Sequence, residues 1–251
     1  MTASTVPDLL GDLLRADPAR PLVTFYDDAT GERVELSVTS FENWVAKTAN
    51  LLQNELSVEP GEQLALWLPA HWQSAVWMCA AASCGSRVSH ATEPPRPVDV
   101  AVCDPDGLEQ AMARGARDVV VLSLRPMGQG VDGPLPDGVT DYAQSVLSEP
   151  DSFRPIEQPQ PDAPFLISAD SERSQRELLD QARDSAQPLG LYPGGRLLTD
   201  ANPASASGFT GGVLAPMVTG GSVVLTRHPD PAAVDARATQ ERVTAQWWCG
   251  G

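Results

Sequence analysis

The sequence predicts an α/β protein built from two layered α/β subdomains. Residues 39–88 contain one helix, strand, helix, strand unit in unbroken order. Two β-branched runs at 98–103 and 118–124 flank a short helix, which makes a βαβ unit and therefore a parallel sheet. Strand-like and helical segments alternate again from residue 165 to residue 247, and this second series predicts the second layer.

The central unit begins at residues 39–42 (TSFE), which have the pattern of a capping box at a helix start. Apolar residues then recur at helical spacing through residue 56, and a Pro-Gly pair ends the helix. Residues 63–68 form a short apolar run typical of a buried strand. Residues 73–84 are apolar nearly all round, as in a fully covered helix, and Gly85 suits its C-cap.

The segments before and after this unit have equally simple patterns. Residues 6–14 predict a short amphipathic helix, which Asp-Pro at 17–18 stops. Residues 22–26 and 33–37 predict a hairpin. Beyond the central unit, the strands of the βαβ unit are joined by a helix at 108–114.

Prolines gather between residues 91 and 165, and residues 126–164 are irregular apart from a short helix predicted at 140–147. Because connections this long are uncommon within a compact domain, we expect a boundary near residue 150, with subdomains at 1–150 and 151–251. Strands are expected at 165–168, 196–199, 222–226 and 243–247, and helices at 172–189, 210–218 and 232–241.

The composition restricts the partners of this chain. A net charge of -16 and a pI near 4.4 give a surface that repels phosphate backbones and anionic lipids, so we expect neither nucleic-acid nor membrane binding. The first residues lack a signal-peptide core and no apolar run reaches the length of a membrane span, which predicts a cytoplasmic protein.

Cysteine and histidine give no pattern of a metal centre. The four cysteines have no CxxC spacing and are interpreted as small buried hydrophobes. His71, His90 and His228 are scattered, and in the sequence none of them neighbours a Cys or carboxylate at ligand spacing. We therefore expect no metal and no cofactor.

Two stretches carry a family resemblance. The order LSVTSF, helix, SVEPGEQLALWLP, Ala-rich helix, CGSRVS resembles the opening of the adenylate-forming superfamily, the acyl-CoA synthetases and their AMP-binding relatives. LGLYPGGRLLT and GGVLAPMVTGGSVVLTRHPDPAAVDARATQERVT resemble a later part of the same family. The resemblance runs from about residue 5 to residue 245 and implies the first half or so of a synthetase N-terminal domain.

Functional motifs of that family are missing from the matching positions. Relatives hold the ATP phosphates with a Gly-rich loop containing a Lys, directly after the strand equivalent to 165–168. Here the sequence is FLISADSERS, in which we expect the strand to pass into a helix through Ala169, Asp170 and Ser171, with no amide cradle. Pro203 begins the position of a Pro-x-x-His motif that lacks its His. The chain also stops before the adenine loop and the C-terminal catalytic domain, so we assign no catalytic residue.

The remaining candidates cluster where an open α/β sheet binds its ligands, at the carboxyl ends of the second-half strands. The candidate crevice consists of Ser168, Asp170, Ser171, Ser205, Ser207, Gly208 and Thr210. The glycines of 208–212 either present free amides to an anion at a helix start or allow close helix packing. The serines equally suit turns and caps.

These observations predict a catalytically degenerate acyl-CoA synthetase homologue that binds or regulates without adenylation. The alternatives are a ligand sensor or enzyme that reuses the acyl or nucleotide crevice, and a scaffold that pairs with a full-length synthetase. Trp247 and Trp248 end the last predicted strand, which would lie at a sheet edge. We therefore expect a homodimer, with a synthetase partner as the alternative.

Overall fold

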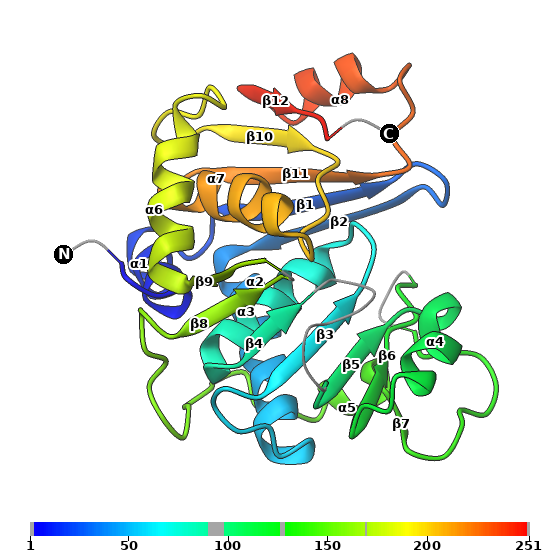
Figure 1. The fold of residues 1–251 in the computed structure, drawn as a ribbon. Helices are drawn as coiled ribbons and strands as arrows, with labels where there is room; N and C mark the ends of the chain where they lie inside the picture. The colour runs from blue at the N-terminus through cyan, green and yellow to red at the C-terminus, as the bar shows by residue number, and fades with distance from the viewer. Residues whose placement is uncertain (1–2, 90–97, 126–128, 169, 250–251) are drawn as a thin grey trace. The chain divides into compact units, whose positions relative to one another are not determined.

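The computed structural model describes residues 3–89, 98–125, 129–168 and 170–249 (Figure 1). The chain divides into two compact units, each with its own sheet. One unit contains Met1–Glu42, Ala70–Ala75 and Arg176–Gly251, and the other contains Asn43–Pro69 and Val76–Gln175. Both units combine segments that are distant in the sequence, which differs from the single boundary expected near residue 150.

The first unit is built on a five-stranded sheet in the order β12-β10-β11-β1-β2. The β1–β2 pair is the predicted antiparallel hairpin, whereas β1 pairs with β11 in parallel, as do β10 with β11 and β10 with β12. The strands are β1 (Pro21–Asp27), β2 (Glu32–Ser37), β10 (Arg196–Thr199), β11 (Ser222–Arg227) and β12 (Ala245–Trp247). The last strand lies at a sheet edge, as predicted.

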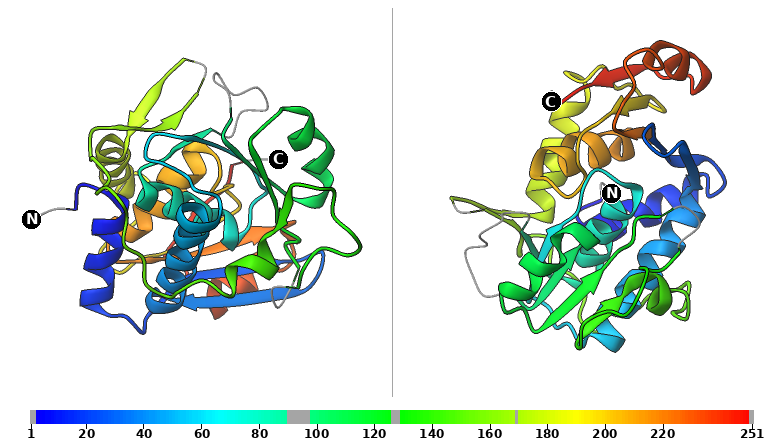
Figure 2. Two further views of the ribbon diagram at one scale, coloured as in Figure 1. Left: turned by 90° about the horizontal axis from the view of Figure 1, so that it is seen from below. Right: turned by 90° about the vertical axis from the view of Figure 1, so that its right-hand side faces the viewer.

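Helices of the first unit follow the alternation that the sequence predicts. They are α1 (Val6–Ala16), α6 (Gln175–Ala186), the π-helix η4 (Gly208–Leu214) with α7 (Ala215–Val218), and α8 (Val234–Gln240). In Figures 1 and 2, α6 and the continuous η4–α7 segment lie side by side. Helix α1 begins with a capping box between Thr5 and Asp8 that the sequence analysis did not identify.

The second unit is built on a seven-stranded sheet in the order β7-β6-β5-β3-β4-β8-β9. Every neighbouring pair is parallel except β8–β9. The strands are β3 (Gln63–Trp67), β4 (Arg87–Ser89), β5 (Val100–Cys103), β6 (Asp118–Val121), β7 (Val139–Asp141), β8 (Pro164–Ile167) and β9 (Glu172–Ser174). The predicted βαβ unit is therefore confirmed by β5, α4 and β6.

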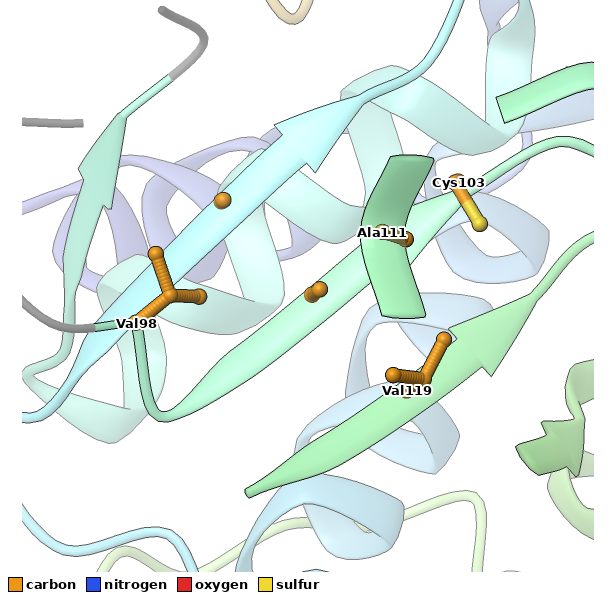
Figure 3. Close-up of a cluster of buried hydrophobic side chains, with 6 residues drawn as sticks. Val98, Cys103, Ala111 and Val119 are labelled. Carbon is orange, nitrogen blue, oxygen red and sulfur yellow. The ribbon is translucent and has the colours of Figure 1, made fainter. Parts of the chain in front are cut away.

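The helices of this unit cover its sheet. They are the C-terminal part of α2 (Val38–Asn50) with the π-helix η1 (Leu51–Glu55), most of α3 (Trp72–Cys84), the 3-10 turn η2 (Pro105–Gly107), α4 (Leu108–Ala113) and α5 (Tyr142–Val146). Figure 3 shows Ala111 of α4 packed over Cys103 of β5 and Val119 of β6, with Val98 at the edge of the same cluster.

A second buried group in this unit is aromatic. Tyr142 begins α5, is 1% exposed, and shares a 2.7 Å hydrogen bond between its hydroxyl and that of Thr48. Its ring lies 5.3 Å from that of Trp77, which is fully buried. Thus α3, which is apolar all round, is covered as predicted.

Several boundaries differ from those predicted. The cap of α2 is Ser37, whose hydroxyl accepts from the Ser40 amide at 3.1 Å, whereas Thr39 donates to the Pro18 carbonyl. Strand β7 precedes the short helix predicted at 140–147. The proline-rich stretch at 91–97 and His90 lie outside the described residues. In the part of the chain that the structure describes, no helix has the length and hydropathy needed to cross a bilayer.

Candidate functional site

The segment after β8, where the resemblance places a phosphate loop, connects β8 (Pro164–Ile167) to β9 (Glu172–Ser174). The strand does not pass into a helix as predicted, because β9 follows β8 directly and pairs with it in antiparallel fashion. Ser168 N donates to Ser171 O at 2.9 Å, Ser171 N donates to Ser168 Oγ at 3.2 Å, and the two hydroxyls lie 2.8 Å apart. Asp170 is exposed in this turn. Only four residues connect the strands, and both serine amides are used inside the turn.

The polar residues before η4 form a second turn. Ser205 Oγ donates to the Asn202 carbonyl at 2.8 Å and accepts from the Gly208 amide at 3.0 Å, while Phe209 N donates to the Ser205 carbonyl. A side-chain Cβ on Gly208 would lie 1.9 Å from the Asn202 carbonyl oxygen. These contacts favour the packing interpretation of the glycines over anion binding, since the amides at the helix start already have acceptors.

One pocket in the first unit includes part of the predicted crevice. It has a volume of about 400 Å³ and contains Ser207, Thr210 and Gly211 on one side. The complete lining is Gln181, Asp184, Ser185, Pro188, Leu189, Ser207, Thr210, Gly211 and Trp247. Of the predicted residues, Ser207 and Thr210 line this pocket, whereas Ser205 and Gly208 belong to the turn beside it. Ser168, Asp170 and Ser171 belong to the other unit and do not line it.

The pocket walls come from two helices and one strand. On α6, residues 181, 184 and 185 are spaced at three and four and therefore share one face, and Pro188 follows in the turn after the helix. Residues 207, 210 and 211 have the same spacing on the opposite wall. The Trp247 indole of β12 packs against Gly211, where a Cβ would come 3.0 Å from the ring. A side chain at position 211 would displace this indole.

The sequence analysis did not predict that α6 forms a wall of the pocket, although the sequence contains a pattern that marks these residues. Leu178, Leu179, Ala182 and Ala186 are buried as predicted, but Leu189 lies past the end of α6 and lines the pocket instead of the core. The polar stripe 181–184–185 is visible in the sequence as the opposite side of the same amphipathic pattern. Nothing in the pattern separates a pocket wall from an ordinary solvated face.

An aspartate and a histidine join the carboxyl ends of β1 and β11. Asp27 Oδ1 lies 2.9 Å from Nδ1 of His228, which adopts a left-handed backbone conformation (φ 49°). Asp27 is 5% exposed, whereas the side chain of His228 is 53% exposed. The sequence analysis found no carboxylate near a histidine because these residues are 201 positions apart. Only the parallel pairing of β1 with β11 brings them together.

His71 lies in the core of the same unit. Its Nδ1 accepts from the Gln73 amide at 3.1 Å, and its ring is 4.5 Å from that of Phe25 in an edge-on arrangement. Burial lowers the pKa of His71 to about 3, with a further contribution from Arg227 and opposition from Asp27. His71 is therefore a neutral core histidine, and no group of three metal-ligating side chains occurs among the described residues.

Three of the four cysteines agree with their sequence interpretation. Cys79, Cys84 and Cys103 are buried, and burial raises the pKa of both Cys84 and Cys103 to about 12. Cys249 is exposed, which differs from the expectation, because it follows the edge strand β12. None of the four is in a disulfide.

The architecture defines the chain as a protein with an acyl-CoA synthetase-like fold, which confirms the predicted resemblance. The crystal structure of the Brucella canis acyl-CoA synthetase matches 97% of this chain with a TM-score of 0.76 and 15% sequence identity. The chain spans 47% of that synthetase chain. At this identity the likeness establishes the fold alone.

A closer relationship identifies the family. A protein of Mycobacterium tuberculosis (strain ATCC 25618 / H37Rv) described as a TIGR03089 family protein is 40% identical over 241 residues. The match covers 94% of this chain and 95% of that protein, so the chain belongs to the TIGR03089 family. No family model matches the sequence.

Proposed function

We propose that this protein is a catalytically degenerate member of the synthetase fold, which binds a ligand or partner and does not form adenylates. The observation that carries this proposal is the hairpin turn at 168–171. A phosphate cradle requires several unpaired backbone amides directed at one anion. In this turn the amides of Ser168 and Ser171 donate within the turn, and Asp170 adds a negative charge.

The position of the second family motif supports the same proposal. In the Pro-x-x-His pattern the fourth residue here is Ala206, which has no group for proton transfer or hydrogen bonding beyond its backbone. Its carbonyl accepts the hydrogen bond of Thr210, and so the local contacts are structural. Without the phosphate cradle and without the histidine, neither motif position supplies the groups with which the family handles ATP.

A ligand-responsive protein is the second candidate, and the pocket between α6, η4 and Trp247 favours it. Its volume of about 400 Å³ falls within the range of small-molecule sites. The predicted residues Ser207 and Thr210 lie in its wall, together with apolar surface from Leu189 and Trp247. A compact ligand bound here would contact α6, η4 and the edge strand β12 at once.

Association with a partner is part of the proposal. Strand β12 forms one edge of the five-stranded sheet, and Trp248 beyond it is 36% exposed. Edge strands offer unpaired backbone groups, and an exposed indole adds apolar area that is stabilised by burial. A homodimer is the first expectation for this edge, and a full-length synthetase is the alternative partner.

Absence of adenylation is testable with ATP and its reaction partners. Calorimetry with ATP and magnesium is expected to detect no binding tighter than about millimolar. Pyrophosphate exchange with a panel of carboxylic acids is expected to be silent. Asp170→Asn serves as the matched variant, since it removes the charge but leaves the four-residue turn. ATP affinity in the micromolar range for the wild-type chain would sink the proposal, and affinity gained only in the variant would assign the loss to Asp170 alone.

A further inference from the structure

We propose that the pocket between α6, η4 and Trp247 binds a compact organic amine in its protonated form, with an apolar body and one ammonium group. This inference rests on the proposed binding function and assigns the chemical class of its ligand. Its basis is the pattern of charge and hydrogen-bonding capacity in the lining.

The charge of the lining has one sign. Asp184 is the single ionisable side chain among the nine residues that line the pocket, and none of them is Lys, Arg or His. The chain as a whole carries a net charge of -16. A carboxylate or phosphate would thus enter a site with no cation to offset its lost hydration, whereas an ammonium group would have a counterion.

Two of the three hydroxyls of the lining, those of Ser185 and Thr210, act as acceptors. Ser185 Oγ already donates to the Gln181 carbonyl at 2.7 Å, and Thr210 Oγ1 already donates to the Ala206 carbonyl at 2.9 Å. A hydroxyl has one hydrogen and two lone pairs, so both groups can only accept from a ligand while these bonds persist. Together with the Asp184 carboxylate, they complement the three N–H donors of an ammonium group.

The apolar part of the lining determines the shape of the ligand body. Pro188, Leu189, Gly211 and the Trp247 indole supply the non-polar surface. An indole face also attracts a cation, most strongly where water is excluded. A volume of about 400 Å³ accommodates a single ring with a short chain and is too small for a nucleotide with an extended acyl group.

A matched set of three probes tests the assignment: 2-phenylethylamine, 2-phenylethanol and phenylacetate, which share a ring and a short chain. Calorimetry on the full chain is expected to give binding of the amine at least about tenfold tighter than that of phenylacetate. The affinity for 2-phenylethanol should lie between those for the amine and for phenylacetate, because the alcohol keeps the apolar contacts and has no charge.

Two variants on the same helix separate the local charge from the net charge. Asp184→Asn is expected to weaken amine binding by up to about fivefold, the upper end of the range for a solvent-accessible ion pair, without changing the affinity for 2-phenylethanol. Asp180→Asn removes an equal charge outside the pocket, where Asp180 pairs with Arg183 at 2.6 Å, and should leave amine affinity unchanged. Both positions are exposed, so neither substitution threatens the fold.

The assignment is overturned if millimolar amine gives no heat of binding, if phenylacetate binds as tightly as the amine, or if both variants act alike. If one of these results is found while pyrophosphate exchange is silent, the assignment of an amine ligand is wrong and the proposed absence of adenylation still stands. Active pyrophosphate exchange would instead overturn the proposed function, whatever the amine does.

Discussion

The side chain of Glu241 holds α8 against the five-stranded sheet, and its loss should destabilise the first unit. Glu241 is buried and accepts from Tyr26 Oη at 2.5 Å, from Arg33 Nη2 at 3.0 Å and from Arg196 Nη2 at 2.6 Å. The Arg237 guanidinium of α8 also lies over the Tyr26 ring, with its Cζ 4.3 Å from the ring centroid. One carboxylate thus connects β1, β2 and β10 at the end of α8.

The magnitude follows from the burial of the partners. The side chains of Glu241 and Arg196 are 6% and 13% exposed, so Glu241→Gln leaves the nearly buried Arg196 charge with only the more distant Glu35 carboxylate, at 3.9 Å, as a counterion. Breaking a buried pair in this way costs about 3–5 kcal/mol, and the 41% exposure of Arg33 argues for the lower end, about 3 kcal/mol. For a protein of this size that is a fall in Tm of about 6–12 °C.

Calorimetric unfolding measures this change, with Glu35→Gln as the control. The side chain of Glu35 is 37% exposed, pairs with Arg33 at 2.8 Å and lies 3.9 Å from Arg196. It is thus a solvent-screened member of the same network, and its loss should cost less than about 1 kcal/mol. Equal effects of the two substitutions, or a change in Tm below about 2 °C for Glu241→Gln, would refute the assignment of stability to the buried carboxylate.

The pH dependence of stability provides an independent check on the role of Glu241. Burial raises the pKa of Glu241, but hydrogen bonds from Tyr26, Arg33 and Arg196 outweigh it, so the pKa lies below its ordinary value. A carboxyl with a depressed pKa stabilises the fold above its unfolded pKa of about 4.3 and loses that contribution as the pH falls through its folded pKa. The difference in stability between wild type and Glu241→Gln should therefore be full at neutral pH and shrink below about pH 4.

Two further predictions concern packing and assembly. Gly208→Ala should lower the free energy of unfolding by at least about 2 kcal/mol, because its Cβ would meet the Asn202 carbonyl oxygen. The helical control Gly11→Ala meets only the flexible end of Arg15 and should be neutral or stabilising. Chemical denaturation distinguishes the two variants, and equal midpoints would contradict the clash. Light scattering at moderate salt should give about twice the 26.7 kDa monomer mass, and Trp248→Gln should lower it; a monomer in the wild type would count against association through β12.

Local patterns predicted most individual elements well. The apolar run at 63–68 is β3, the apolar helix at 73–84 is α3, and the strand at 196–199 has the predicted bounds. These segments have strong periodicity or uniform burial, which a sequence expresses directly. Predictions were weaker for short polar strands such as β9, whose residues Glu172–Ser174 resemble a helix start. These residues form a strand because they pair with β8, and not because of a local β preference.

The candidate crevice was only partly accessible from the sequence, since its residues were grouped by the ends of predicted strands and not by sheet membership. Residues near 168 and near 207 both follow strands, but β8 belongs to the seven-stranded sheet and β10 to the five-stranded one. The resemblance to the synthetase fold did not assign strands to sheets. Long-range pairing therefore decided which predicted residues share a pocket.

Pairing across long sequence separations also holds the five-stranded sheet together. In the first unit, β11 lies between β10 and β1, and the Glu241 network connects the same strands to α8. The turn at 168–171 and the Pro203–Ala206 segment contribute loops at the ends of strands and no strand to either sheet. Because the stability of the fold resides in the sheets and their covering helices, we expect substitutions in these loops to cost little folding free energy.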